Sequence, residues 1–154
     1  MGTPTVLRSG IVDVVCGEGV RIVEPANLYG CTLGDGVFVG PFVEIQRGVT
    51  IGAGTRIQSH AFVCELVTVG RDCFIGHGVM FVNDLFTHGG PARGCRDLWR
   101  PTEIGDNVSI GSNATILAVR IAPRTVIGAG AVVTKDIDRP GVYAGNPARL
   151  VREL

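Results

Sequence analysis

The sequence predicts an all-β fold in which short strands wind as a flat-sided coil. Three observations predict it: an apolar residue recurs every six positions, glycine often follows that residue, and glycine is abundant in a chain of otherwise ordinary composition. The chain has 154 residues with 23 Gly and 8 Pro, and 45% of its residues are hydrophobic. So much glycine in a chain that is neither polar nor collagen-like indicates a packed structure with many special backbone positions.

The six-residue repeat is unbroken between residues 33 and 81 and resumes after residue 103. Its apolar positions are Leu33, Val39, Ile45, Ile51, Ile57, Val63, Val69, Ile75 and Phe81, then Ile104, Ile110 and Ile116, then, after a contraction by one residue, Ile121, Ile127 and Val133. A period of six matches neither the 3.6 of a helix nor the 2 of an isolated amphipathic strand. It suits blocks of one short strand and one turn, three blocks closing a triangular coil.

Stacked coils predict which residues lie inside and which lie above one another. The apolar residue of each block points inward, and we expect the glycine after it to adopt a turn conformation that a Cβ disfavours. Residues 18 positions apart then form columns, with Arg47, Glu65 and Asn83 in one and Ser59 and His77 in another. Cys73 occupies the small fifth position of its block, so it is expected in the core.

Two segments leave the period within what we interpret as one domain of residues 1–154. Residues 82–103 contain Gly, Pro and Arg together with Trp99, the single tryptophan, and predict a loop extruded from the coil. Residues 138–154 predict a C-terminal tail that is mostly non-helical because of its Pro and Gly residues, with a terminal helix after Pro147 as an option.

Charge and composition narrow the function. The 14 basic residues balance the 14 acidic ones, which argues against a nucleic-acid partner bound through phosphates. No apolar run approaches the ~20 residues of a membrane span, and no leader pattern is present, so we expect a cytoplasmic protein with no membrane partner. Five cysteines without a Cys-x-x-Cys pair fit reduced thiols rather than a disulfide frame or a metal site.

The candidate catalytic residues gather where the chain leaves the coil. His77, Asn83, Asp84 and His88 fall within twelve residues, beside a loop held by a rigid scaffold, where functional groups concentrate. Each also has a plainer interpretation. His77 fits a solvent-facing turn residue, His88 an ordinary loop residue, and the Asn-Asp pair a turn start.

The repeat resembles that of the hexapeptide-repeat acyltransferase superfamily over about residues 11–150, which implies a left-handed parallel β-helix. The stretch IGHGVMFVND (75–84), the loop and WRPTEIGD (99–106) are similar to bacterial N-acetyltransferases that act on nucleotide-linked 3-amino sugars for lipopolysaccharide and related surface polysaccharides. GPFVEIQ (40–46), GAGAVVTKD (128–136) and AGNPAR (144–149) also resemble that group. The resemblance implies an acetyl-CoA-dependent N-acetyltransferase, a nucleotide-linked amino sugar as its substrate, and a homotrimer with sites between prisms.

Carried over by position, the resemblance places Asn83 and Asp84 at the sugar's amino group. His77 or His88 then takes the proton that the amine loses, and a backbone N–H stabilises the oxyanion. The cofactor residues expected are Gly128, Ala129 and Gly130 along the pantetheine arm, Lys135 and Arg149 near the phosphates, and Asn146 and Pro147 in the same cofactor-binding tail. Lys135 is the single lysine of the chain, and a solvated surface lysine is its plainer interpretation.

Three alternatives remain open at this level. A sugar O-acetyltransferase of the same fold would use a hydroxyl acceptor. A γ-type carbonic anhydrase would need a third imidazole beside His60 and His77, but Val82 stands at the position where that family has it. A non-catalytic β-helix used as an assembly module would explain the coil, but it gives no role to Lys135 and the AGNPAR stretch.

Overall fold

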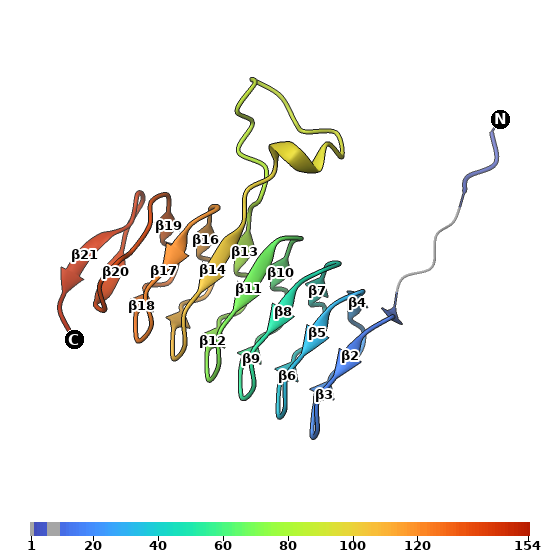
Figure 1. Cartoon of the computed structure of the whole chain (residues 1–154), viewed down its shortest axis with the longest axis horizontal. Helices are drawn as coiled ribbons and strands as arrows, with labels where there is room; N and C mark the ends of the chain where they lie inside the picture. The colour runs from blue at the N-terminus through green and yellow to red at the C-terminus, as the bar shows by residue number, and fades with distance from the viewer. Residues whose placement is uncertain (1, 6–9) are drawn as a thin grey trace.

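The computed structural model describes residues 2–5 and 10–154, and the chain winds there as a three-sided coil of short strands (Figure 1). Each strand from β1 to β20 pairs in parallel with a strand one turn away, which produces three flat sheets along the coil. The predicted class, a left-handed parallel β-helix with one extruded loop, is confirmed.

The strands of the three sheets follow one another in the chain, one strand per side of the triangle. Sheet A contains β1 (Ile11–Val12), β4 (Asn27–Tyr29), β7 (Glu44–Ile45), β10 (Phe62–Val63), β13 (Met80–Phe81), β16 (Thr115–Ile116) and β19 (Val132–Val133). Sheet B contains β2 (Val15–Cys16), β5 (Thr32–Leu33), β8 (Thr50–Ile51), β11 (Val67–Val69), β14 (Thr102–Ile104) and β17 (Arg120–Ile121). Sheet C contains β3 (Arg21–Ile22), β6 (Phe38–Val39), β9 (Arg56–Ile57), β12 (Phe74–Ile75), β15 (Ser109–Ile110), β18 (Val126–Ile127), β20 (Val142–Ala144) and β21 (Arg149–Arg152).

The turns between the sheets form three edges, which we name by the sheets they join. The AB edge follows the sheet A strands, the BC edge follows the sheet B strands, and the CA edge follows the sheet C strands and leads into the next turn of the coil. Because each edge recurs once per turn, its residues stack in columns along the molecule.

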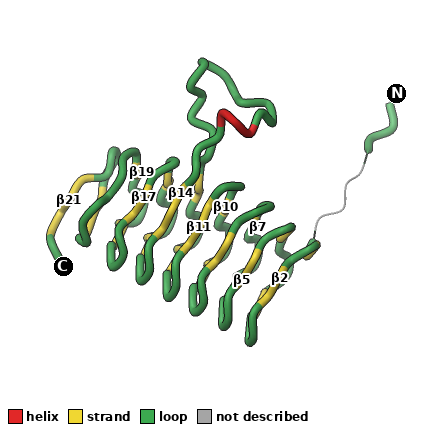
Figure 2. The backbone as a smooth tube through the Cα atoms, viewed as in Figure 1, coloured by secondary structure: helices red, strands yellow, loops and turns green. Residues whose placement is uncertain are grey.

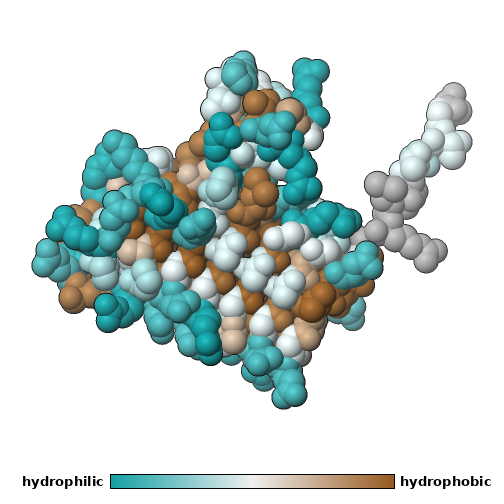
Figure 3. Space-filling model, in the orientation of Figure 1, coloured by the Kyte–Doolittle hydropathy of each residue, from teal (hydrophilic) through white to brown (hydrophobic). Residues whose placement is uncertain are grey.

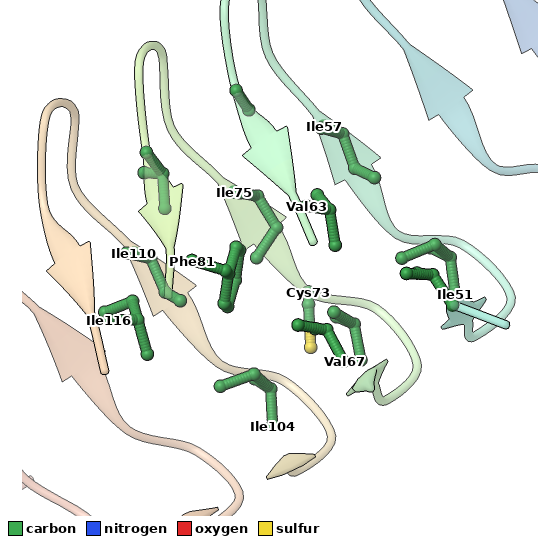
Figure 4. Close-up of a cluster of buried hydrophobic side chains, with 14 of the residues drawn as sticks. Ile51, Ile57, Val63, Val67, Cys73, Ile75, Phe81, Ile104, Ile110 and Ile116 are labelled. Carbon is green, nitrogen blue, oxygen red and sulfur yellow. The ribbon is translucent and has the colours of Figure 1, made fainter. Parts of the chain in front are cut away.

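The aliphatic repeat forms the core inside the prism, as predicted (Figure 4). Leu33 pairs with Ile51 and Val39 with Ile57, each 18 residues away, so equivalent blocks lie above one another. Cys73 is only 2% exposed and belongs to this core. Burying an aliphatic side chain of this kind contributes about 1.5–3 kcal/mol relative to leaving it in water. The repeated burial therefore holds successive turns together.

The glycine after each aliphatic residue serves a different purpose from the predicted one. Gly52 does not adopt the left-handed turn conformation; a Cβ there would lie 2.5 Å from the carbonyl carbon and oxygen of Gly70 in the next turn. The left-handed conformation falls two residues later, at Gly36 and Gly54 for example. The glycine after the aliphatic residue is required because the backbones of neighbouring turns touch there, so the expected turn conformation was wrong.

The extruded loop is two residues shorter than predicted. It leaves after β13 and ends at Pro101, because Thr102 and Glu103 already belong to β14 and pair with Val67 and Thr68 of β11. Within the loop lies η1 (Arg96–Leu98), a 3₁₀ helix shown in red in Figure 2. No helix in the described ranges is both long and apolar enough to cross a membrane.

The C-terminal tail ends in a strand, so the optional terminal helix is wrong. After a turn at Gly145, residues Arg149–Arg152 form β21 antiparallel to β20, with Leu150 opposite Tyr143. A segment of this length gains little as an isolated helix. The backbone groups of β20, at the end of sheet C, offer it partners instead.

Two glycine variants separate close approach from turn conformation. We expect Gly52→Ala to lower the free energy of unfolding by about 3 kcal/mol, since backbone cannot yield to the new Cβ. We expect Gly36→Ala to cost only about 1 kcal/mol, because that site has open space and only its left-handed conformation is strained. Urea unfolding measures both, and the reverse order would contradict this account of the repeat.

Candidate active site

The extruded loop starts and ends on the AB edge, where its two stems are hydrogen-bonded. The Arg100 N–H donates to the Asn83 carbonyl at 2.9 Å, and the Thr102 N–H donates to the Leu66 carbonyl of the preceding turn at 3.1 Å. In Figure 2 the loop stands out from the regular coil with η1 folded back toward it. The first residues of the loop are therefore fixed to the scaffold rather than free.

Asn83 lies in the predicted column and is oriented by it. Its side-chain Nδ2 donates to the Glu65 carbonyl of the turn below at 3.1 Å, 18 residues away. The side chain is half-buried, and its Oδ1 accepts none of the hydrogen bonds found within the described residues. The amide thus presents an acceptor, the group that an amine N–H of a ligand requires.

Asp84, the next residue, is used inside the loop. Its Oδ1 accepts the Phe86 N–H at 3.0 Å, and its Oδ2 accepts the Ala92 N–H at 2.7 Å. Ala92 is buried at 6% exposure, so this carboxylate closes the loop on itself. Because both oxygens have partners, Asp84 contributes to the site by fixing the loop that begins at Asn83.

Glu65 anchors the loop from below. Its Oε2 lies 2.8 Å from a guanidinium nitrogen of Arg96 in η1, an ion pair whose angles do not make a hydrogen bond. The Glu65 side chain is 18% exposed, so the pair is shielded more than an ordinary surface pair. The loop is thereby drawn toward the N-terminal turns of the coil.

A row of polar side chains continues from Glu65 toward the N-terminus. The Glu65 N–H donates to Gln46 Oε1 at 3.2 Å, and Gln46 Nε2 donates to Glu44 Oε1 at 3.0 Å. The Tyr29 hydroxyl donates to the same Glu44 oxygen at 3.4 Å, and burial together with the negative charge of Glu44 raises the pKa of Tyr29. This row was not identified from the sequence. The sequence feature that could have indicated it is a pair of outward polar residues, Glu44 and Gln46, on either side of the buried Ile45.

His77 and Asn83 lie on different edges of the prism within one chain. His77 lies on the CA edge, before β13, whereas Asn83 lies on the AB edge, after it. His77 stacks above Ser59 as predicted, with Nδ1 2.8 Å from the Ser59 Oγ. His88 lies exposed in the loop.

His60 also lies on the CA edge, one turn from His77, whereas Val82 follows β13 at the start of the loop. No cluster of three metal-binding side chains occurs among residues 2–5 and 10–154.

The structure brings Lys135 and Arg149 together but separates them from the other expected cofactor residues. Both line a hollow of about 290 Å³ on the AB edge at the C-terminal end of the coil. Gly128, Ala129 and Gly130 lie on the CA edge, where a Cβ on Gly128 would meet Ala144 at 2.9 Å. Asn146 and Pro147 lie in the turn between β20 and β21, outside this hollow.

A second hollow joins the foot of the loop to the Lys135 end. It has a volume of about 520 Å³ and shares Asp136 with the first; its lining residues are Leu85, Arg100, Pro101, Glu103, Ala118, Val119, Arg120 and Asp136. The two hollows adjoin at Asp136 on the AB edge, and we call the pair the edge groove. Figure 3, which views the side of sheet B, shows hydrophilic side chains gathered at the loop and at the C-terminal end.

Arg120 and Asp136 form the charged wall of the edge groove. Asp136 accepts the Arg120 backbone N–H at 2.8 Å and the guanidinium at 2.9 and 3.1 Å. These contacts lower the pKa of Asp136, the backbone N–H contributing most. This pair was not selected from the sequence, since the two residues lie 16 positions apart across the contracted turn.

Comparison with known proteins identifies related sequences and folds. The family model "Bacterial transferase hexapeptide (six repeats)" matches residues 30–65, and "Hexapeptide repeat of succinyl-transferase" matches residues 101–135. The chain is 30% identical to the bifunctional protein GlmU of Thermotoga petrophila, over 93% of this chain and 34% of that protein. It is 36% identical to the mitochondrial serine acetyltransferase 3 of Arabidopsis thaliana, over 71% of this chain and 26% of that one. The chain thus spans about a third or less of the length of these curated relatives.

Two solved structures are similar along most of the chain. A hexapeptide-repeat acetyltransferase of Vibrio cholerae, solved with acetyl coenzyme A, matches with a TM-score of 0.69 and 28% identity, over 81% of this chain and 71% of that one. The N-acyltransferase AntD of Bacillus cereus, solved as a mutant with dTDP and coenzyme A, matches with a TM-score of 0.77 over 90% and 83% of the two chains. Because the two sequences are only 20% identical, this match indicates similarity of fold alone.

The contacts of Asp84 predict a measurable role in loop order. We expect Asp84→Ala to speed amide hydrogen exchange at Phe86 and Ala92 by roughly tenfold or more, because both N–H groups lose a charged acceptor. Asp106→Ala is the matched control, since Asp106 accepts a backbone N–H of Arg71 on the BC edge and does not touch the loop. Unchanged exchange at Phe86 and Ala92 would show that the carboxylate does not hold the loop.

Proposed function

Since this chain belongs to the hexapeptide-repeat acyltransferase superfamily, we propose that it transfers the acetyl group of acetyl-CoA to the amino group of a nucleotide-linked amino-deoxy sugar. One observation carries the proposal: the edge groove runs from the loop that begins at Asn83 to a hollow that holds Lys135 and Arg149. The Asn83 side chain, which can accept an amine N–H, therefore lies near the loop end of the edge groove. Lys135 and Arg149, two cations that can bind phosphate, lie at the other end.

The chemistry requires little beyond positioning. A deprotonated amine is a competent nucleophile toward a thioester, so holding the two in line supplies much of the acceleration. Asn83 Oδ1 orients the amine while Nδ2 stays bonded to the scaffold. A backbone N–H of the loop stabilises the oxyanion of the tetrahedral intermediate, and the proton that the amine loses passes to His77 or His88. The C–S bond of the thioester then breaks, and CoA leaves as a thiolate that takes up a proton to become the free thiol.

The cofactor occupies the edge groove in this proposal. The pantetheine arm lies along Leu85, Pro101, Ala118 and Val119, which give the second hollow an apolar side. The phosphates meet Lys135 and Arg149 as charge-assisted contacts. Gly128, Ala129 and Gly130, on the opposite edge, reach the same cofactor only from a neighbouring copy of the chain.

A homotrimer assembles the complete site. The AB and CA edges are the two borders of sheet A, so three prisms that turn sheet A toward a common axis bring the CA edge of one copy to the AB edge of the next. His77 and Asn83 flank the same strand, β13, and therefore meet at the same height across that junction. Phe62 and Met80 face outward on sheet A, and Met80 is 42% exposed, which supports its burial in such an interface. A stable monomer with full turnover would contradict the trimer.

The proposal places the reaction in the cytoplasm, in the assembly of a bacterial lipopolysaccharide or another surface polysaccharide. Cys16 and Cys95 are exposed free thiols, and Cys31, Cys64 and Cys73 are buried ones. Burial raises the pKa of Cys64 to about 12 and that of Cys31 to about 11, so these thiols stay protonated. Unpaired cysteines on the surface fit a reducing compartment.

A sugar hydroxyl is the second candidate acceptor. The Ser59–His77 contact favours it, because an imidazole held by a hydrogen bond is what a hydroxyl nucleophile needs as a general base. Acetyl-CoA turnover against a panel of UDP- and dTDP-linked amino sugars, with their hydroxyl counterparts, separates the two acceptors. No turnover with any amino sugar would refute the first.

Asn83 gives the sharpest kinetic test. We expect Asn83→Ala to lower turnover at least tenfold, about 1.4 kcal/mol in the barrier, because the amine loses the acceptor that aligns it. Thr50→Ala, an exposed position on β8 of sheet B, is the control and should retain wild-type kinetics. Wild-type kinetics in the Asn83 variant would show that the amine is held elsewhere.

Lys135 tests the cofactor end of the edge groove. We expect Lys135→Ala to weaken CoA binding roughly tenfold, through the loss of one charge-assisted phosphate contact. The affinity for pantetheine, which has no phosphate, should not change. Isothermal titration measures both ligands, with Arg71→Ala on the BC edge as the control cation. Equal losses for CoA and pantetheine would place the phosphates elsewhere, and no CoA binding by the wild-type chain would favour a non-catalytic β-helix.

A further inference from the structure

An exposed aromatic pair on the CA edge has no role in the site described so far. Phe42 and His60 occupy successive turns of the coil, and their rings stack with centroids 4.8 Å apart and an interplanar angle of 13°. Phe42 is 57% exposed, so the pair is held on the surface and contributes little to the core.

The backbone makes this exposure unusual. Phe42 and His60 have φ values of 59° and 64°, in the left-handed region that bulky residues rarely adopt. The same column continues with Gly78, Asn113 and Gly130, residues that take this conformation at little cost. Folding alone would favour such a residue at position 42. The phenyl ring is present despite its backbone strain and despite its exposure, which indicates a purpose outside folding.

A hollow borders the face of the Phe42 ring that is turned away from His60. Its volume is about 240 Å³, and its lining residues are Pro25, Ala26, Asn27, Phe42, Val43 and Glu44. His60 takes no part in this lining, so it supports the ring from behind. The hollow therefore has one aromatic wall, the Phe42 ring, which His60 supports.

The polar groups of the hollow complement a flat ring with both a carbonyl and an N–H. Asn27 uses its Oδ1 to accept the Gly10 N–H at 3.2 Å, and its NH₂ group donates to no other group among the described residues. Glu44 uses Oε1 for Tyr29 and Gln46, and its Oε2 accepts no hydrogen bond within residues 2–5 and 10–154. A pyrimidine-2,4-dione, the ring of uracil and thymine, presents a carbonyl beside an imide N–H.

We propose that this hollow binds the uracil or thymine base of the nucleotide sugar by stacking on Phe42. The inference rests on the proposed function and extends it to the nucleotide half of the substrate. Phe42 and Asn83 lie two turns apart along the coil, about 10 Å at the usual strand spacing, and on the two edges that meet in the proposed trimer. The diphosphate bridges the base on one copy to the amino sugar on the next. The nucleotide then approaches from the N-terminal turns and CoA from the C-terminal turns.

The test measures nucleotide binding without any acetyl transfer. UDP, dTDP and GDP are titrated calorimetrically into the full chain and its variants, with no sugar and no acetyl-CoA present. We expect UDP and dTDP to bind, Phe42→Leu to weaken both at least tenfold, and Phe42→Tyr to restore them to within about threefold, because stacking needs a ring and not only apolar bulk. Phe74→Leu removes another exposed phenyl ring, 41% exposed on sheet C, and should leave both affinities unchanged.

A further variant separates the binding role from a structural one. Phe42→Asn places a residue that tolerates the left-handed conformation, so it should keep or raise the melting temperature while nucleotide binding is lost. Three results would each overturn the proposal: unchanged UDP affinity in Phe42→Leu, equal affinity of the wild-type chain for GDP and UDP, and dissociation of the Phe42→Leu oligomer in sedimentation. Acetylation of an amino sugar with unchanged nucleotide binding in Phe42→Leu would refute this site alone. Nucleotide binding that depends on Phe42 without any acetyl transfer would refute the proposed function alone.

Discussion

The distance between neighbouring turns of the coil is the constraint on which the rest of the structure depends. Neighbouring hydrogen-bonded strands lie about 4.8 Å apart, and here every turn between the two ends of the coil pairs with the turns on both sides of it. Where the backbones of two turns meet, as at Gly52 and Gly111, no side chain fits between them. The same spacing fills the inside of the prism with aliphatic side chains, because each turn supplies the same small set of inward positions. The glycines of the repeat therefore mark the positions where the backbones of neighbouring turns are in contact.

This spacing also decides how polar and aromatic groups are arranged. Side chains at equivalent positions of successive turns are forced into columns. One result is the polar row that runs from Tyr29 and Glu44 on sheet A to Asn83 on the AB edge, and another is the stack of Phe42 on His60 on the CA edge. A regular prism has no deep cleft of its own, and its faces are flat. The polar groups described above are therefore concentrated on edges and on the loop, and the two borders of sheet A would meet between copies in the proposed trimer.

The neighbouring residues Asn83 and Asp84 show how the tertiary structure divides roles that look alike. Both are short polar side chains at the point where the chain leaves the coil. The scaffold carbonyl of Glu65 binds the donor of Asn83 and leaves its acceptor open, whereas two loop N–H groups occupy both oxygens of Asp84. In the proposed reaction, the charged group closes the loop and the neutral amide that faces outward accepts the amine N–H without taking up a proton.

The sequence by itself determined the coil, the inward residues, the columns through Asn83 and His77, and the place of the loop, because all of these follow from a period that local spacing imposes. It also indicated Lys135 and Arg149 as neighbours at one end. The tertiary structure alone decided that the glycines serve close approach, that the tail pairs as a strand, that Gly128 to Gly130 lie on another edge from Lys135, and that Arg96 reaches Glu65. Those features depend on contacts between turns and on the path of the loop. Such contacts join residues that are far apart in the sequence, and they leave no periodic pattern in it.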